Sequence, residues 1–245
     1  MTKTFRNPLE NRDAPDPFMT YDPVTGYFYA LFTCGDRLEL YRSRHAARIL
    51  TDRDSRVVFR VGREHGIYDC VWAPEMHKAP NGKWYIYTSG TYQPEGWEKR
   101  LFVMESETAD PFDGFCFKGK LDENLHAIDP TVYTDEQGKQ YICYSNGGSA
   151  QHLFIRELEN PWTLAEKCDD VSHAEYDWEM VPPYVGKDTI NEGAFFVKNG
   201  ERLFIIYSGN GCWSDDYCLG VLEYTGGELC DRSSWKKHPV PLFVK

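Results

Sequence analysis

The stretch DPTVYTDEQGKQYICYSN, residues 129–146, decides the fold of this chain. It begins with an acidic residue and proline, runs as a short strand, turns at Gly138 and returns as a strand rich in tyrosine and isoleucine. Two such runs joined by a glycine turn predict a β-hairpin. The same plan occurs three more times, in DPFMTYDPVTGYFYALFT (16–33), APEMHKAPNGKWYIYTSG (73–90) and EGAFFVKNGERLFIIYSG (192–209).

The four hairpins repeat with a nearly constant period. Pro17, Pro74, Pro130 and Gly193 mark matching points, separated by 57, 56 and 63 residues. A further half-buried strand follows each hairpin, at 37–44, 99–106, 151–158 and 217–224, and no long amphipathic helix interrupts them. A period of this length is typical of one blade of a β-propeller. The sequence therefore predicts an all-β chain in one domain, 1–245, with blades at roughly 1–65, 66–122, 123–185 and 186–245.

Composition limits the classes of partner. The net charge of −11 and the pI of about 5.1 argue against nucleic acid, because a phosphate backbone is bound by clustered Lys and Arg. Neither a secretory leader nor a membrane-length apolar run is found, so we expect a soluble, cytoplasmic protein with no membrane partner. The eight cysteines are scattered, without metal-ligand spacing, and are expected to be free buried thiols.

The heads of the repeats carry the candidate chemistry. In a propeller the first strand of each blade lines the axis, so the heads converge at one end of a funnel. Three heads are acidic, Asp16, Asp129 and Glu192, and the fourth is Ala73. Hydrolysis of a glycosidic bond uses one carboxylic acid to protonate the leaving oxygen and one carboxylate to activate water or attack the sugar. Each dipeptide alone is ordinary turn chemistry, but three acids in phase with the repeat indicate a catalytic set.

These segments resemble glycoside hydrolase family 43, and the similarity covers nearly the whole chain. The segments that carry it are NPLENRDAPDPF (7–18), VWAPEMH (71–77) with NGKWYIYTSG (81–90), HAIDPTVYTDEQGKQYICYS (126–145) and INEGAFFVKNGERLFIIYSGNGCWSDDYCLGVLEY (190–224). The resemblance implies a five-bladed propeller and an inverting mechanism. It makes Asp16 the general base, Asp129 the group that tunes the acid, and Glu192 the general acid. Asp13 is a second candidate for the base, but it lies outside the repeat phase.

The resemblance also implies a sugar substrate. We expect hydrolysis of terminal α-L-arabinofuranosyl or β-D-xylosyl groups of plant-type oligosaccharides, and YSGNGCWSDDYCLGVL (207–222) is most similar to arabinofuranosidases. Trp72 is predicted to form part of the sugar-binding wall and Trp213 to stack from the rim, with Trp97 as a further rim candidate. Glu75 lies two residues beyond its repeat head and is expected to support the site or the structure.

No cofactor is expected for the chemistry. The resemblance also implies a structural ion such as calcium near the axis, which members of the family often hold partly through a histidine of the fifth blade. No segment of this sequence matches that histidine. Histidine pairs with metal-ligand spacing are missing, so no catalytic metal is expected, and the seven histidines are assigned to the surface or to packing.

Two other functions stay open. A retaining propeller that cleaves sucrose or fructan also uses three carboxylates, but the WMNDPNG-like opening of that group is absent. A non-catalytic carbohydrate-binding propeller becomes a serious alternative if the propeller is incomplete. The next repeat head would fall near position 250, beyond Lys245. The sequence therefore predicts a propeller without its fifth blade, which self-associates through its open edge or closes with weakened activity.

Overall fold

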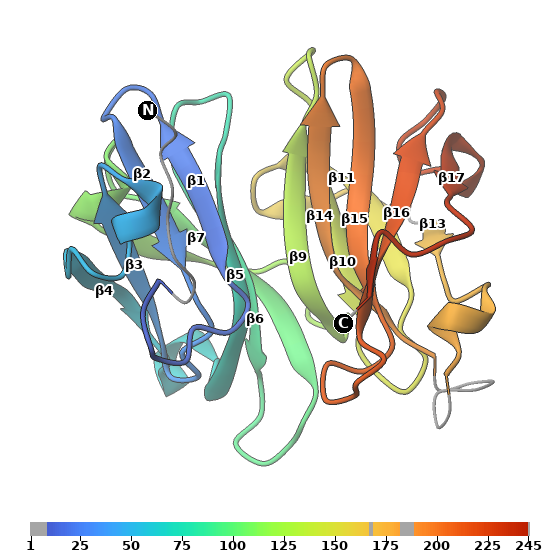
Figure 1. The fold of residues 1–245 in the computed structure, drawn as a ribbon. Coiled ribbons are helices and arrows are strands. Elements are labelled where there is room, and N and C mark those ends of the chain that lie inside the picture. Colours follow the sequence, from blue (N-terminus) through green and yellow to red (C-terminus); the bar gives the residue numbers. More distant parts are fainter. Residues whose placement is uncertain (1–8, 167–168, 182–188, 245) are drawn as a thin grey trace.

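The computed structural model of the chain describes residues 9–166, 169–181 and 189–244. Residues 7 and 8 of the segment NPLENRDAPDPF, and Cys168, lie outside the described residues. The described chain forms four antiparallel sheets, each built from consecutive strands (Figure 1). Short 3-10 helices lie between strands, both within a sheet and between sheets, and none of the described helices is long and apolar enough to cross a membrane.

The four sheets follow one another along the chain. The first has β1 (Phe18–Asp22), β2 (Tyr27–Leu31), β3 (Arg37–Ser43) and β4 (Ser55–Arg60), and the second β5 (Asp69–Lys78), β6 (Trp84–Thr91), β7 (Lys99–Ser106) and β8 (Phe115–Lys120). The third has β9 (Ala127–Thr134), β10 (Gln140–Asn146), β11 (Leu153–Asn160), β12 (Thr163–Leu164) and β13 (Asp169–Ser172). The fourth has β14 (Asn191–Asn199), β15 (Arg202–Gly209), β16 (Cys218–Tyr224), β17 (Trp235–Lys237) and β18 (Phe243–Val244). The 3-10 helices are η1 (Ala46–Arg48), η2 (Arg63–His65), η3 (Pro111–Asp113), η4 (Asp177–Glu179) and η6 (Arg232–Ser234).

The four predicted hairpins are confirmed, and each turns at a glycine. Gly26, Gly82, Gly138 and Gly200 all have φ between +63° and +84°. A side chain is strained at such a φ, so glycine is the residue that these tight turns favour. The hairpins are β1–β2, β5–β6, β9–β10 and β14–β15.

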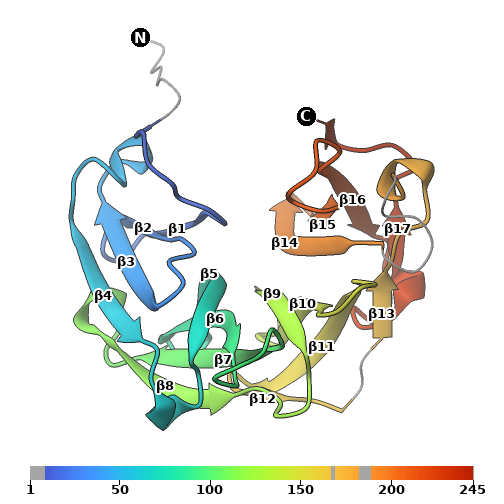
Figure 2. The same ribbon diagram turned by 90° about the horizontal axis from the view of Figure 1, so that it is seen from below.

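The sheets stand around a common axis as the blades of a propeller do (Figure 2). In every sheet the first strand is innermost, so β1, β5, β9 and β14 surround the axis. The predicted all-β propeller with four blade repeats is therefore confirmed. The described sheets form an arc that stays open between the first sheet and the fourth, and a five-bladed arrangement is not confirmed by them (Figure 2).

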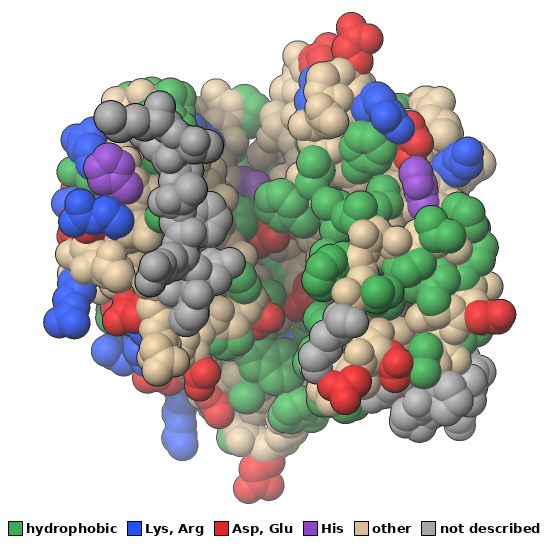
Figure 3. Space-filling model, viewed as in Figure 1, with side chains coloured by type: hydrophobic (Ala, Val, Ile, Leu, Met, Phe, Trp, Pro, Cys, Tyr) green, Lys and Arg blue, Asp and Glu red, His purple; other side chains and the backbone are tan. Residues whose placement is uncertain are grey.

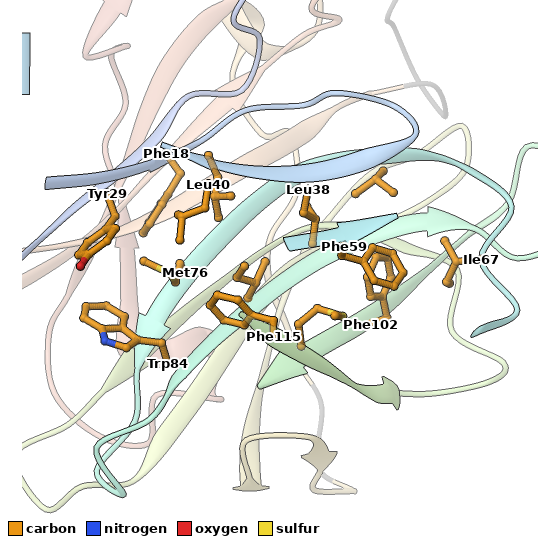
Figure 4. Packing of buried hydrophobic residues seen from close by; sticks show 14 residues of the cluster. Phe18, Tyr29, Leu38, Leu40, Phe59, Ile67, Met76, Trp84, Phe102 and Phe115 are labelled. Carbon is orange, nitrogen blue, oxygen red and sulfur yellow. The ribbon is translucent and has the colours of Figure 1, made fainter. Parts of the chain in front are cut away.

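Apolar side chains between neighbouring sheets hold the arc together. Between the first two sheets, Phe18 and Tyr29 of the first hairpin lie near Met76 and Trp84 of the second (Figure 4). Tyr29 and Trp84 pack with ring centroids 6.3 Å apart. Burying a side chain of this size contributes roughly 1.5–3 kcal/mol, so each interface is a substantial source of stability. It also fixes where the inner strands stand relative to one another.

The cysteines fit their prediction only in part. None of the seven described cysteines forms a disulfide with another described one. Cys143, Cys218 and Cys230 are buried, but Cys116 and Cys212 are exposed. The expectation of buried thiols is therefore wrong for these two, which stand on an outer strand and in the loop before β16.

Candidate functional site

A β-bulge interrupts each inner strand of the last three sheets where its repeat head lies. The pairing of β5 with β6 skips Ala73, that of β9 with β10 skips Asp129, and that of β14 with β15 skips Gly193. These residues, with Asp16 before β1, have φ between +42° and +58°. Three of the four are not glycine, and each such conformation costs on the order of 1–3 kcal/mol. Strain of this kind, repeated at one level of the funnel, is typical of a functional site.

The structure corrects the alignment of the fourth repeat. Opposite the bulges, Trp72 pairs with Ser89, Ile128 with Ser145 and Glu192 with Ser208. Glu192 is therefore equivalent to Trp72 and Ile128, one residue before the position of the two aspartates. Gly193 holds the aspartate position, and the prolines of the other repeats correspond to Ala194 rather than to Gly193. The predicted equivalence of the three acids is thus wrong by one residue for Glu192.

The three predicted acids nevertheless come together. The charges of Asp16 and Asp129 both raise the pKa of Glu192, which requires that they lie near it. Asp129 also accepts a hydrogen bond at Oδ2 from the Gly193 N–H, at 3.0 Å, so the residue after Glu192 ties the two acids together. Figure 3 shows acidic side chains in the hollow between the first two sheets and the last two.

Asp129 and Glu192 have strongly altered acidities. Burial is the largest cause and raises the pKa of both. The charge of Asp16 raises the pKa of Asp129 further, and the charge of Asp129 raises that of Glu192. Two like charges this close cannot both be ionised easily, so the pair holds a proton at a pH where an ordinary carboxyl has lost it. A protonated carboxylic acid at neutral pH is what a general acid requires.

Tyr217 is a neighbour of Glu192 that the sequence did not reveal. Its side chain hydrogen-bonds to Glu192, and Ser208 hydrogen-bonds to Tyr217 in turn. Burial, followed by the charge of Glu192, raises the pKa of Tyr217 far above neutrality, so its O–H is the donor to Glu192. Tyr217 lies in the loop before β16, and only the pairing of β14, β15 and β16 brings it to Glu192.

Asp16 has a different environment. It is exposed, and its Oδ2 accepts a hydrogen bond from the Thr33 hydroxyl at 2.5 Å. The Thr33 oxygen itself accepts from the Ala73 N–H at 2.7 Å, so its own hydrogen is directed to Asp16. Thr33 therefore joins two of the strained repeat heads. Asp13, the other candidate base, is exposed and lies three residues earlier.

Glu75 stands close behind these acids. Its charge is one of the causes that raise the pKa of Asp129, after burial and the charge of Asp16. Its Oε2 lies 2.8 Å from Nε2 of His77, which also faces the Val132 N–H. This fits the expectation that Glu75 supports the site.

The axial calcium site that the family resemblance implies stays a prediction. Within the described residues, the group of His, Cys, Asp or Glu side chains that converges closely enough for one metal is His152, Asp170 and His173. Asp170 lies on β13, which pairs with β11 in the outer part of the third sheet (Figure 2), and His152 and His173 adjoin these strands.

The predicted aromatic residues border the same end of the funnel. Trp72 packs edge-on against the exposed Trp97, with ring centroids 5.2 Å apart. The ammonium group of the buried Lys99 lies 4.1 Å and 4.3 Å from the two ring centres, and burial lowers the pKa of Lys99. Trp213 is exposed and follows Cys212, whose pKa is raised by burial and then by the charges of the three acids. Trp72 thus directly precedes the strained head at Ala73, and Trp213 directly follows a cysteine that lies near the acids.

A buried polar network lies behind Glu192. The preceding residue, Asn191, is fully buried and contacts Glu179 and Lys237, at 3.0 Å and 3.1 Å. Glu179 and Lys237 form an ion pair of 2.8 Å with side chains only 0% and 6% exposed. Burial raises the pKa of Glu179, but the charge and hydrogen bond of Lys237 outweigh it and leave the pKa below its usual value. This network fixes the backbone from which Glu192 projects.

Relatives of known sequence and structure match the chain over most of its length. An "Extracellular exo-alpha-(1->5)-L-arabinofuranosidase" of Streptomyces chartreusis is 32% identical over 253 residues, which is 98% of this chain and 73% of that protein. The protein of the same name from Streptomyces avermitilis is 29% identical, and the chain spans half of its length. The crystal structure of an alpha-L-arabinofuranosidase from Lactobacillus brevis superposes with a TM-score of 0.84 at 26% identity, covering 98% of this chain and 76% of that one.

The relatives contradict one expectation. Both Streptomyces proteins are named extracellular, and this overturns the prediction of a cytoplasmic protein. The prediction rested on finding neither a secretory leader nor a membrane-length apolar run in the sequence.

The sequence pattern of "Glycosyl hydrolases family 43" matches residues 5–245. The match includes all four repeats and the acids that their bulges bring together. The chain is therefore a glycosidase that belongs to glycosyl hydrolase family 43.

Proposed function

We propose that the chain is an α-L-arabinofuranosidase that removes terminal arabinofuranosyl groups with inversion, using Glu192 as general acid and Asp16 as general base. The observation that carries the proposal is the contrast between the two acids. Glu192 is buried beside Asp129 with a raised pKa, whereas Asp16 is exposed and accepts a hydrogen bond from Thr33. Different environments for two carboxyl groups are how one site supplies both an acid and a base.

In the proposed reaction Asp16 accepts a proton from a water molecule as the water oxygen attacks the anomeric carbon. Glu192 donates its proton to the glycosidic oxygen on the opposite side as the bond from carbon to that oxygen breaks. Asp16 ends protonated and Glu192 ionised, and exchange with solvent restores both. In an inverting enzyme the two carboxyl groups stand roughly 6.5–9.5 Å apart, which leaves room for the water.

Asp129 has a supporting part in this proposal. Its charge raises the pKa of Glu192, and its contact with the Gly193 N–H fixes the acid's backbone. Tyr217 orients the Glu192 carboxyl group through its O–H. The proton transfers use these side chains, and we propose that they need no cofactor.

The substrate proposal rests on the relatives. The proteins from Streptomyces and Lactobacillus brevis are named arabinofuranosidases, which favours an arabinofuranosyl group over a xylosyl group. We propose that Trp72 forms the wall of the sugar site and that Trp213 stacks on the substrate from the rim.

A panel of aryl α-L-arabinofuranosides, β-D-xylosides and β-D-galactosides tests the substrate proposal. We expect the largest kcat/KM on the arabinofuranoside. A preference for the xyloside would overturn the choice of sugar, and no hydrolysis of any member would favour a carbohydrate-binding propeller. Proton NMR of the first sugar released then reports whether the anomeric configuration is inverted.

The organisation of the protein is also a proposal. The names of the relatives support an extracellular location. The opening between the first and fourth sheets supports a propeller of the five-bladed type, or self-association through that side (Figure 2). We propose that residues 1–245 form a single catalytic domain.

A further inference from the structure

Two histidines converge on one carboxylate oxygen at the outer part of the third sheet. Oδ2 of Asp170, on β13, lies 2.8 Å from Nδ1 of His152 and 3.0 Å from Nδ1 of His173. His152 directly precedes β11, with which β13 pairs, and His173 directly follows β13. Strand pairing therefore brings together three side chains that are 18 and 3 residues apart in sequence.

The hydrogen atoms available at this cluster cannot satisfy all its contacts. Nδ1 of His173 lies close to both Asp170 and Nη1 of Arg232, the latter at 2.7 Å. Arg232 Nη2 also lies 3.2 Å from Nε2 of the same ring, and Nη1 lies 3.8 Å from Oδ2 of Asp170. If Nδ1 of His173 carries a proton, two N–H donors face each other, one from His173 and one from Arg232. If it carries a lone pair, two acceptors face each other, the nitrogen and the Asp170 carboxylate. A ring nitrogen holds one or the other, so one of these close contacts is repulsive in either case.

The second carboxylate oxygen of Asp170 independently indicates that a ligand is missing at this cluster. Oδ1 is buried and has no hydrogen-bond partner among the described residues. A buried carboxylate oxygen without a partner is costly, and such atoms mark places where an ion or water is missing. The contact conflict and the lone oxygen both lie on the same three side chains.

We propose that His152, Asp170 and His173 bind a divalent transition-metal ion of the Zn²⁺ class, through the two Nδ1 atoms and the Asp170 carboxylate. A tetrahedral zinc ion with bonds of 2.0–2.1 Å holds its ligand atoms roughly 3.3 Å apart. The ligand atoms here all lie within 4.8 Å of one another, and two of the separations are 2.8 and 3.0 Å. Two imidazoles favour zinc over calcium, which takes oxygen ligands.

The metal removes the conflict at His173. Its nitrogen would then direct a lone pair to the ion, and Arg232 would turn away while keeping its ion pair with Glu175. The side chains of His152 and His173 are 33% and 35% exposed, which leaves room for a water as the fourth ligand. This site is separate from the catalytic acids.

Bound metal would stabilise the contact between the third and fourth sheets. The His173 carbonyl accepts a hydrogen bond from Lys237, which also contacts Glu179 and Asn191. A ligand that binds only the folded chain raises its thermal midpoint. The inferred role is therefore structural support of the backbone behind Glu192.

The test is a titration with Zn²⁺ alone of protein first freed of metal by dialysis against EDTA. Isothermal calorimetry should show one equivalent bound per chain, with a rise in thermal midpoint. Asp170→Asn and the double variant His152→Asn/His173→Asn should each weaken binding by at least about tenfold. His238→Asn, which removes a histidine paired with Glu223 elsewhere on the fourth sheet, should bind as the parent does.

Two further measurements separate this site from the cysteines and from misfolding. Co²⁺ in place of Zn²⁺ should give ligand-field bands without a thiolate charge-transfer band. Arg232→Gln should tighten binding, because it removes the competing guanidinium and leaves the three ligands in place. The proposal is overturned by the lack of stoichiometric binding, by unchanged binding in the double variant, by a thiolate band, or by weaker binding in Arg232→Gln.

Discussion

At the scale of single residues, the acidity of Glu192 depends on burial first and on its neighbours second. Of these neighbours, Asp129 raises its pKa and Tyr217 lowers it. The two effects have opposite signs, so replacing Asp129 and replacing Tyr217 should shift the pKa of Glu192 in opposite directions. This gives the assignment of Glu192 a signature that general damage to the fold would not reproduce.

Replacing Asp129 by Asn removes the negative charge that keeps the proton on Glu192. The pKa of Glu192 should fall, so the alkaline limb of kcat/KM against pH should move to lower pH, with a lower maximum rate. Profiles of parent and variant on one aryl arabinofuranoside measure this. An alkaline limb that stays in place would show that Asp129 serves only to bind substrate.

Replacing Tyr217 by Phe removes a hydrogen bond to the ionised form of Glu192. The pKa of Glu192 should rise, and the alkaline limb should move to higher pH, opposite to the change in Asp129→Asn. Tyr224→Phe, in the same sheet but bonded to the Gly227 carbonyl, is the matched control and should keep the parent profile. A shift in the same direction as that of Asp129→Asn would refute the role assigned to Tyr217.

At the scale of elements, one hydroxyl joins the first two sheets at the site. Thr33, which follows β2, donates to Asp16 and accepts from the bulge of β5 at Ala73. Thr33→Val keeps the shape but loses both hydrogen bonds. Because a hydrogen bond to a charged group contributes about 1.5–3 kcal/mol, kcat should fall by roughly tenfold or more. Thr33→Ser retains the hydroxyl and should restore most of the rate, and failure of that rescue would argue for a packing role.

The ion pair of Glu179 and Lys237 joins η4 to β17 behind Glu192. Lys237→Met leaves a buried carboxylate without its partner, which should lower the free energy of unfolding by about 3–5 kcal/mol. Lys198→Met breaks the exposed pair with Glu136 and should cost no more than about 1 kcal/mol. Urea denaturation measures both, and equal losses would contradict the buried network.

The elements show which features a sequence can reveal. Strand alternation and turn glycines are local, and they predicted all four hairpins. The three acids also followed from the repeat, but the head of the fourth repeat was aligned one residue out. Gly193 was matched to the prolines of the other heads because both residue types favour turns, whereas in the bulge Gly193 takes the position of the aspartates. Tyr217 and Thr33 leave no local pattern, since strand pairing alone brings them to the acids. The same holds for the histidines around Asp170.

At the scale of the whole molecule, the fourth sheet presents an apolar face on the open side of the arc. Phe195 pairs with Ile206, and Val197 with Phe204, on the face opposite the core that is shared with the third sheet. At its inner end this face meets the first sheet, where the Phe195 and Phe18 ring centroids lie 6.3 Å apart. Figure 3 shows apolar side chains gathered over β14, β15 and β16. Apolar patches of this kind mark association surfaces.

Self-association through this face stays a prediction. Light scattering should give a mass above that of one 28.4 kDa chain at high protein concentration. Ile206→Lys should return the mass to that of the monomer, whereas Val57→Lys, on β4 of the first sheet, should not. A monomer at every concentration in the parent protein would refute association through the fourth sheet.

The assignment of Glu192 as general acid and Asp16 as general base is tested most directly by measuring how the rate depends on the leaving group of the substrate. Glu192→Gln and Asp16→Asn should each lower the rate on a poor leaving group by roughly 10²–10⁴-fold. An aryl arabinofuranoside with a good leaving group needs no protonation, so it should restore much of the rate of Glu192→Gln and none of that of Asp16→Asn. Asp13→Asn is the matched control and should react as the parent does. Equal losses on both substrates in the two variants would contradict the account.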